Sequence, residues 1–117
     1  MSTKARQRLI DQIDRLVESS GHLRKELKGY EKTMSLISRR LEAGEPGVGA
    51  SAGTGIPGQR KRVTEVIEEF EAERHQLRLA LFALGKEEGA SISEIGRVLG
   101  ISRQLASRLA GEAARSQ

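Results

Sequence analysis

An apolar stripe at heptad spacing, from residue 9 to residue 41, limits what this chain can fold into more than any other feature of its sequence. Its apolar members follow steps of four, three or seven residues, and they are Leu9, Ile13, Leu16, Leu23, Leu27, Tyr30, Met34, Ile37 and Leu41. A sustained period of about 3.5 residues keeps one face of a helix turned toward a partner helix. We therefore predict a long coiled-coil-like helix over residues 1–43, which joins two copies of the chain into a homodimer.

The residues beside the stripe leave the partner of this helix open. Ile10 and Val17 widen the apolar face at its N-terminal end, which favours packing against more than one helix. A parallel homodimer would place Glu26 near Glu31 of the second copy, and an antiparallel arrangement avoids this like-charge pair. The same helix can also fold back on residues 61–85 of its own chain.

Residues 44–59 separate this helix from the rest of the chain. Six glycines and both prolines lie there, with almost no large apolar side chain. Such a segment buries too little surface to offset the entropy of ordering it. We predict a flexible linker over 44–59 and a second helical domain over 60–117.

The composition favours an all-α fold. Hydrophobic residues make up 37% of the 117 residues and three residues are aromatic, so the core must consist mainly of Leu, Ile, Val and Ala. The absence of cysteine excludes disulfides, thiol catalysis and Cys-ligated zinc. No apolar run approaches the roughly 20 residues that span a bilayer, so we expect a cytoplasmic protein with no membrane partner.

The second helical domain begins with a helix over residues 61–85 that changes character along its length. Between Leu77 and Leu84 it is apolar on nearly all sides, which indicates burial in a small core. Arg74 interrupts its apolar stripe, and we expect this side chain to pair with Glu71 or Glu73.

Two short helices are expected after this one. Ser91 and Glu94 have the spacing of a capping box, in which each side chain binds the backbone amide of the other residue. The helix should end at Gly100, because glycine readily adopts the left-handed conformation. Ser102 can then cap a second helix that runs to about Ala114. The pattern predicts two helices joined by a three-residue turn.

Residues 92–111 resemble a bacterial helix-turn-helix DNA-binding unit through the run Ile95-Gly96-Arg97-Val98-Leu99-Gly100-Ile101-Ser102-Arg103-Gln104-Leu105-Ala106-Ser107-Arg108-Leu109. The run is similar to small actinobacterial helix-turn-helix proteins and, more loosely, to the promoter-reading region of sigma factors. Gly96 matches the small residue where the two helices cross, and Gly100 matches the turn glycine. Ala106 departs from the pattern, because Val or Ile is usual there, and Phe82 or Leu105 would have to fill the space.

The resemblance implies a sequence-specific protein that binds double-stranded DNA, with the helix over 102–114 in the major groove. Its exposed candidates for base contacts are Ser102, Arg103, Gln104, Ser107 and Arg108. Arginine suits guanine and glutamine suits adenine. Candidates for contacts to backbone phosphates are Ser91, Ser93, Arg97 and the basic run Arg60, Lys61 and Arg62.

Other patterns do not indicate an enzyme, a cofactor or a metal. Gly53–Gly58 match the spacing of a dinucleotide-binding fingerprint, but no strand precedes them. His22 and His75 have no paired ligands at helical spacing, so we expect surface histidines. The net charge of +4 does not decide the question either, because residues 87–117 hold four basic and four acidic residues.

The sequence therefore predicts a dimeric transcription regulator that acts in the nucleoid. Two alternatives stay open. The long helix can dock on RNA polymerase or a sigma factor, so that the protein is an adaptor. The protein can also coat DNA with little sequence preference, which would give weak dependence on sequence and steep dependence on salt.

Overall fold

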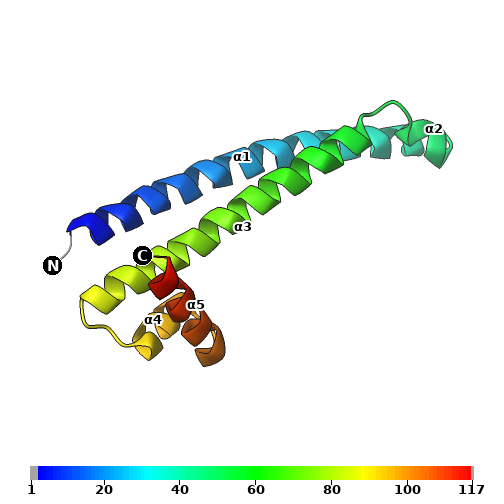
Figure 1. The fold of residues 1–117 in the computed structure, drawn as a ribbon. Helices are drawn as coiled ribbons and strands as arrows, with labels where there is room; N and C mark the ends of the chain where they lie inside the picture. The colour runs from blue at the N-terminus through cyan, green and yellow to red at the C-terminus, as the bar shows by residue number, and fades with distance from the viewer. Residues whose placement is uncertain (1–2, 117) are drawn as a thin grey trace. The chain divides into compact units, whose positions relative to one another are not determined.

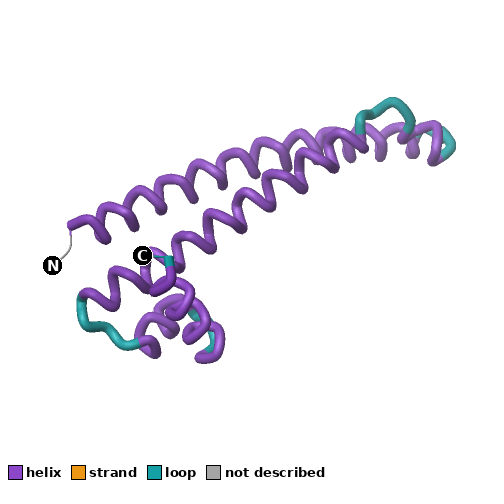
Figure 2. Tube along the Cα trace, viewed as in Figure 1, coloured by secondary structure: helices purple, strands orange, loops and turns teal. Residues whose placement is uncertain are grey.

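The computed structural model describes residues 3–116 and is all-α, as predicted. Met1, Ser2 and Gln117, which belong to the predicted segments 1–43 and 60–117, lie outside the described residues. The described part has no strand, and its helices are α1 (Thr3–Glu42), α2 (Gly47–Ser51), α3 (Ile56–Glu87), α4 (Ile92–Leu99) and α5 (Arg103–Arg115) (Figure 1). Only short loops connect these helices (Figure 2). Within residues 3–116, no helix has both the length and the apolar character that a membrane span requires.

Contacts divide the chain into two compact units. The hairpin unit comprises Glu18–Phe70, and the helix-turn-helix unit comprises the chain up to Val17 together with the chain from Glu71 onward. The long helices α1 and α3 each contribute to both units. These boundaries differ from the predicted ones near residues 43 and 60, because a change in composition marks where glycine and proline gather and not where contacts end.

In the hairpin unit, α1 and α3 run antiparallel within one chain. The polar contacts between them join His22 Nδ1 to Glu69 Oε1 at 3.1 Å, Glu26 Oε2 to Arg62 Nε at 3.4 Å, and the Gly29 carbonyl to Gln59 Nε2 at 3.4 Å. Residue numbers rise along α1 as they fall along α3, which defines the antiparallel pairing. The packing of α1 on its own chain, one of the arrangements left open by the sequence, is therefore present.

The heptad stripe on α1 is partly covered by the chain itself. Ile37 is buried, and the half-buried members are Leu9, Leu16, Leu23, Tyr30 and Met34. The exposed members are Ile13, Leu27 and Leu41. The polar residues Gln12 and Ser19 are buried on the same helix, which a simple heptad seam would not predict. The intramolecular partner of α1 thus leaves part of the stripe free.

Residues 44–59, the predicted flexible linker, contain α2 and the first turn of α3. Ala50 of α2 is fully buried, and Arg40 Nη1 donates to its carbonyl oxygen at 3.3 Å. Pro57 lies in the first turn of α3, where the missing N–H of proline leaves no helical hydrogen bond unmade. Helix α3 therefore begins at Ile56, one turn earlier than predicted.

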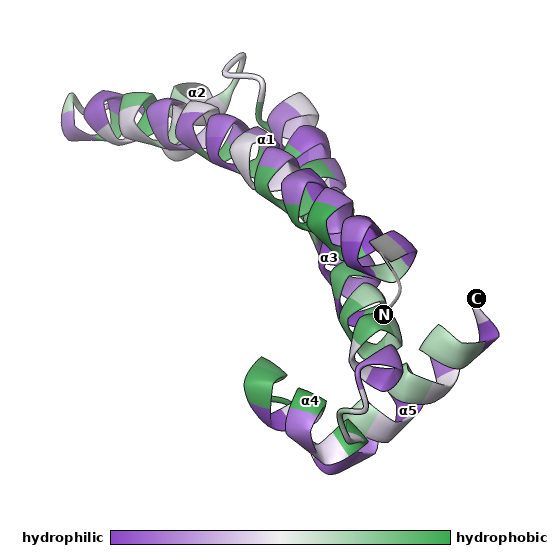
Figure 3. Ribbon diagram, turned by 90° about the vertical axis from the view of Figure 1, so that its left-hand side faces the viewer, coloured by the Kyte–Doolittle hydropathy of each residue, from purple (hydrophilic) through white to green (hydrophobic). Residues whose placement is uncertain are grey.

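In the helix-turn-helix unit, α3, α4 and α5 enclose a small core. Its buried members are Leu79, Phe82, Ile95, Ala106, Leu109 and Ala113. Hydrophobic residues gather toward the C-terminal end of α3 and on α4 (Figure 3). The predicted burial around Leu77–Leu84 is confirmed from Leu79 onward, since Leu79 to Leu84, apart from the half-buried Leu81, are buried. This core holds the two short helices against α3.

The N-terminal part of α1 belongs to the same unit. Gln12 Nε2 donates to the backbone carbonyl of Glu73 at 3.1 Å and to Glu73 Oε2 at 2.6 Å. Arg6 forms an ion pair with Glu88. The start of α1 is therefore joined to α3 through side-chain contacts.

Candidate nucleic-acid interface

A complete capping box begins α4. Ser91 Oγ accepts a hydrogen bond from the Glu94 amide, and the Ser91 amide donates to Glu94 Oε1, both at 3.1 Å. The hydrogen bond from the Ser91 backbone lowers the pKa of Glu94 below its ordinary value of 4.5, and the Ser91 side chain and Arg97 lower it further. The start of α4 is thus fixed locally, as the sequence predicts.

The turn between α4 and α5 is built on Gly100. Its φ of 68° lies in the left-handed region, and the Gly100 and Ile101 amides donate to the carbonyls of Arg97 and Gly96 at 3.1 Å. Ser102 then caps α5, because its Oγ accepts from the Leu105 amide at 3.1 Å. Both predicted ends of the turn are confirmed.

Close contacts fix how the three helices cross. A Cβ added to Gly96 would lie 3.0 Å from the Cβ of Ala106, a contact tighter than most, so a larger residue at 96 would require α4 or α5 to shift. A Cβ added to Gly85 would lie 2.5 Å from Cδ1 of Ile95, so the side chain of Ile95 packs directly on Gly85 of α3. The smaller residue at Ala106 is accompanied by Phe82 in the same core, with Leu105 packed against it. The structure therefore positions α5 firmly on α3 and α4.

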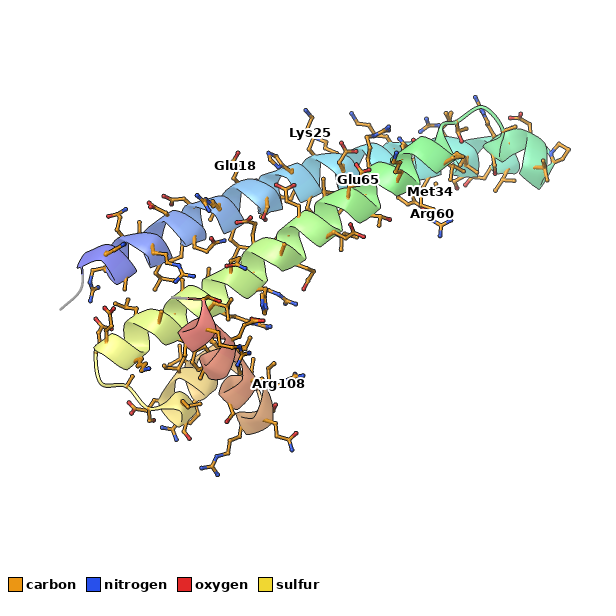
Figure 4. The ribbon with its side chains drawn as sticks, in the orientation of Figure 1. Glu18, Lys25, Met34, Arg60, Glu65 and Arg108 are labelled. Atoms are coloured by element: carbon orange, nitrogen blue, oxygen red, sulfur yellow. The ribbon has the colours of Figure 1, made fainter. Side chains whose placement is uncertain are left out.

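The predicted base-contact residues lie on the exposed surface of α5. Arg103, Gln104, Ser107 and Arg108 are all exposed, and the first turn contains no acidic residue. Figure 4 shows Arg108 directed outward from α5. Ser102 is exposed too, although its oxygen serves the helix cap. The structure brings these residues together at the N-terminal half of one helix.

Two of the clefts along α5 contain arginines. The α4-side cleft is lined by Ser93, Gly96, Arg97, Ile101, Arg103 and Ala106. The cleft thus contains two predicted phosphate-binding residues, Ser93 and Arg97, and the predicted base-contact residue Arg103. Ser91 is exposed at the start of the same helix α4. The predicted phosphate contacts on α4 therefore lie beside the predicted reading helix.

The α3-side cleft contains functional candidates that the sequence patterns did not single out. Its charged lining residues are His75 and Arg78 from α3, and Arg108, Glu112 and Arg115 from α5. Arg115 follows Arg108 by seven residues, which places both on one face of the helix. Helical periodicity could therefore have identified Arg115 as a candidate from the sequence. Nothing in the local sequence connects Arg78 with α5, because only the packing of α3 on α5 brings them together.

Carboxylates and arginines differ in their partners around α5. Three of the four carboxylates in residues 87–116 have close partners: Glu88 with Arg6, Glu94 with Ser91, and Glu112 with His75. None of the arginines in that range, which are Arg97, Arg103, Arg108 and Arg115, forms an ion pair with another described residue. The segment is neutral by count, yet its positive groups are the ones available to an anionic partner.

The basic run Arg60, Lys61 and Arg62 lies elsewhere. All three residues are exposed on α3 within the hairpin unit, and Arg62 is paired with Glu26. Figure 4 labels Arg60 near the start of α3 and Arg108 on α5. The run therefore does not belong to the unit that holds the helix-turn-helix.

Each of the two histidines lies beside a carboxylate. His22 lies beside Glu69, and His75 Nε2 lies 2.5 Å from Glu112 Oε2, an oxygen that is buried and has no other partner among the described residues. No group of three or more potential metal ligands occurs within residues 3–116.

Comparisons of the chain with models of protein families, with curated proteins and with solved structures find no match.

Proposed function

We propose that this protein binds double-stranded DNA in a sequence-dependent manner, with α5 in the major groove. The observation that supports this most is the contrast on and around α5, where arginines are exposed without ion pairs while neighbouring carboxylates have partners. An anionic polymer would meet the free guanidinium groups without displacing an internal ion pair. The helix is also held by a packed core, so its exposed residues are presented on a rigid element.

The exposed residues of α5 suit the chemistry of base edges. Arg103 or Arg108 would donate two hydrogen bonds to guanine O6 and N7, and Gln104 would pair with adenine N6 and N7. Each such pair discriminates against the wrong base by about 1–3 kcal/mol. Ser91, Ser93 and Arg97 would contact phosphates from the α4 side, which sets the register without reading sequence.

We further propose that two copies act together in transcription regulation. A single recognition helix buries little surface, and a two-fold pair would read half-sites about one helical turn apart. Ile10, Ile13 and Val17 form an exposed apolar patch on α1, with 45%, 43% and 65% of their surface accessible. This patch is the surface that we propose joins the copies.

The test is a selection of bound sequences from random duplex DNA at stated salt concentrations, followed by affinity measurements on the selected duplex. We expect one enriched motif, and we expect Gln104→Ala to reduce the preference for it. Gln76→Ala is the matched control, because Gln76 is an exposed glutamine on α3 outside the candidate interface.

Other outcomes would favour the alternatives. Tight binding with no enriched sequence and a steep salt dependence would indicate a protein that coats DNA. No binding to any duplex, combined with retention of RNA polymerase or a sigma factor, would indicate an adaptor. Either outcome would overturn sequence-dependent reading by α5.

A further inference from the structure

The α3-side cleft carries a second group of unpaired arginines. Arg78 is half-buried on α3, while Arg108 and Arg115 are exposed on α5. None of the three forms an ion pair among residues 3–116. Arg74, one turn before Arg78, differs, because its Nη2 lies 2.6 Å from Glu71 Oε2. Three guanidinium groups thus line one cleft, and none of them has an ion-pair partner among the described residues.

Two leucines and one carboxylate also line this cleft and influence what it can bind. Leu109 is buried beneath it and Leu105 is half-buried, so the guanidinium groups stand over an apolar floor. Glu112 is the one carboxylate that lines the cleft, and its Oε2 lies 2.5 Å from His75 Nε2. The acid is therefore directed to the imidazole, and the arginines remain available to an outside anion.

The cleft lies on the opposite flank of α5 from the α4-side cleft. Arg103 and Ala106 face the α4 side, whereas Arg108 and Glu112 lie nearly half a helical turn around from them. A helix with its side chains is about 10–12 Å wide, and the major groove is about 12 Å wide. A helix that fills the groove consequently has one phosphate backbone along each flank.

We propose that Arg78 and Arg115 bind phosphates of the DNA strand opposite to the one approached from α4, so that α5 is held between two backbones. The proposal rests on the proposed function and adds the residues of α3 to the DNA-binding surface. Arg108 lines the same cleft and is also a candidate for base contact. Phosphate contacts of this kind raise affinity for every sequence alike and increase its dependence on salt.

The experiment measures binding of the full chain to a fluorescein-labelled duplex carrying the selected sequence and to a scrambled duplex of equal composition, over a series of salt concentrations. Arg78→Ala and Arg115→Ala should each weaken binding to both duplexes by the same factor, about tenfold at low salt. Each should reduce the slope of log affinity against log salt by about 1. Arg78→Lys should retain the slope, because it keeps the charge.

Arg74→Ala is the matched control, since it removes an arginine from the same helix that is already paired with Glu71. Weaker DNA binding by Arg78→Ala, with wild-type binding by Arg74→Ala, supports the proposal. An equal loss of affinity in both variants overturns it. Unchanged affinity and slope in Arg78→Ala and Arg115→Ala, with lost sequence preference in Gln104→Ala, would overturn this inference and leave the proposed function standing. A wild-type chain that binds neither duplex would overturn both.

Discussion

Gly96 of α4 approaches Ala106 of α5 so closely that a Cβ on Gly96 would lie 3.0 Å from the Ala106 Cβ. Ala106 is 1% exposed, so it has no room to withdraw. The two small residues determine how near α5 can come to α4, and therefore how the exposed face of α5 is presented. The small residue at 106, a departure from the usual helix-turn-helix pattern, is thus part of a tight crossing.

Gly96→Ala should lower the stability of the helix-turn-helix unit. Alanine in a helix interior is favoured over glycine by about 1 kcal/mol, whereas overpacking a core costs about 1–3 kcal/mol. The Cβ of Ala106 has no rotamer by which to move aside, so overpacking should dominate, with a net loss of about 1 kcal/mol in urea denaturation. Gly29→Ala is the control, because a Cβ there meets nothing within 4 Å. Equal or greater stability of Gly96→Ala relative to Gly29→Ala would contradict the close crossing.

Gly100→Ala should destabilise the turn. The φ of Gly100 is 68°, and an L-residue in this region costs roughly 1–2 kcal/mol. Gly100→Asn should lose less stability than Gly100→Ala, since asparagine tolerates the left-handed conformation better than alanine does. Thermal and urea denaturation of the two variants give the comparison, and a larger loss for Gly100→Asn would argue against strain as the cause.

Gln12→Ala should separate the start of α1 from α3. Gln12 is 6% exposed and donates to both the carbonyl and the carboxylate of Glu73, so its loss leaves these two part-buried acceptors without that donor. We expect a loss of about 1–3 kcal/mol in the free energy of unfolding. Gln7→Ala is the matched control, because the amide of Gln7 donates to the exposed Asp11 one turn away and to no other residue among those described. A similar small effect in both variants would show that the Gln12 contact contributes little.

The capping box should make stability depend on pH through Glu94. The folded-state pKa of Glu94 lies below its ordinary value of 4.5, so the unfolded chain binds this proton more tightly. The contribution is therefore fully present above that ordinary value and is lost as the pH falls through it toward the lower folded-state pKa. Glu94→Gln should keep the cap geometry without this part of the pH dependence. Parallel acid titrations followed by circular dichroism would test this, and identical profiles would contradict it.

The exposed patch on α1 should control assembly. Ile13→Glu introduces a charge in the middle of Ile10, Ile13 and Val17, so we expect the mass in sedimentation equilibrium to fall from two chains to one. Val48→Glu is the control, because Val48 is 86% exposed on α2 and lies outside the heptad stripe. A wild-type chain that sediments as a monomer, or a dimer that survives Ile13→Glu, would rule out the patch as the dimer interface.

The ends of α4 and α5 were predictable because their signals are local. The capping box of Ser91 and Glu94, the left-handed Gly100 and the cap by Ser102 each involve residues no more than a few positions apart. Such interactions form at helix ends between residues close in sequence, so residue type and spacing suffice to find them. The burial around Leu79 and Phe82 was likewise readable, since apolar residues occupy every side of that helix.

Sequence alone determined that α1 needs a partner, that the fold is all-α and that two short helices follow α3. Tertiary structure alone decided which partner α1 takes, because a heptad period specifies an apolar face and not the chain that covers it. It also decided that residues 44–59 contain α2, where the buried Ala50 contacts Arg40. Tertiary structure also placed Arg78 and Arg115 in one cleft. These residues are 37 positions apart in the sequence, and they line the same cleft only because α3 and α5 pack around a common core.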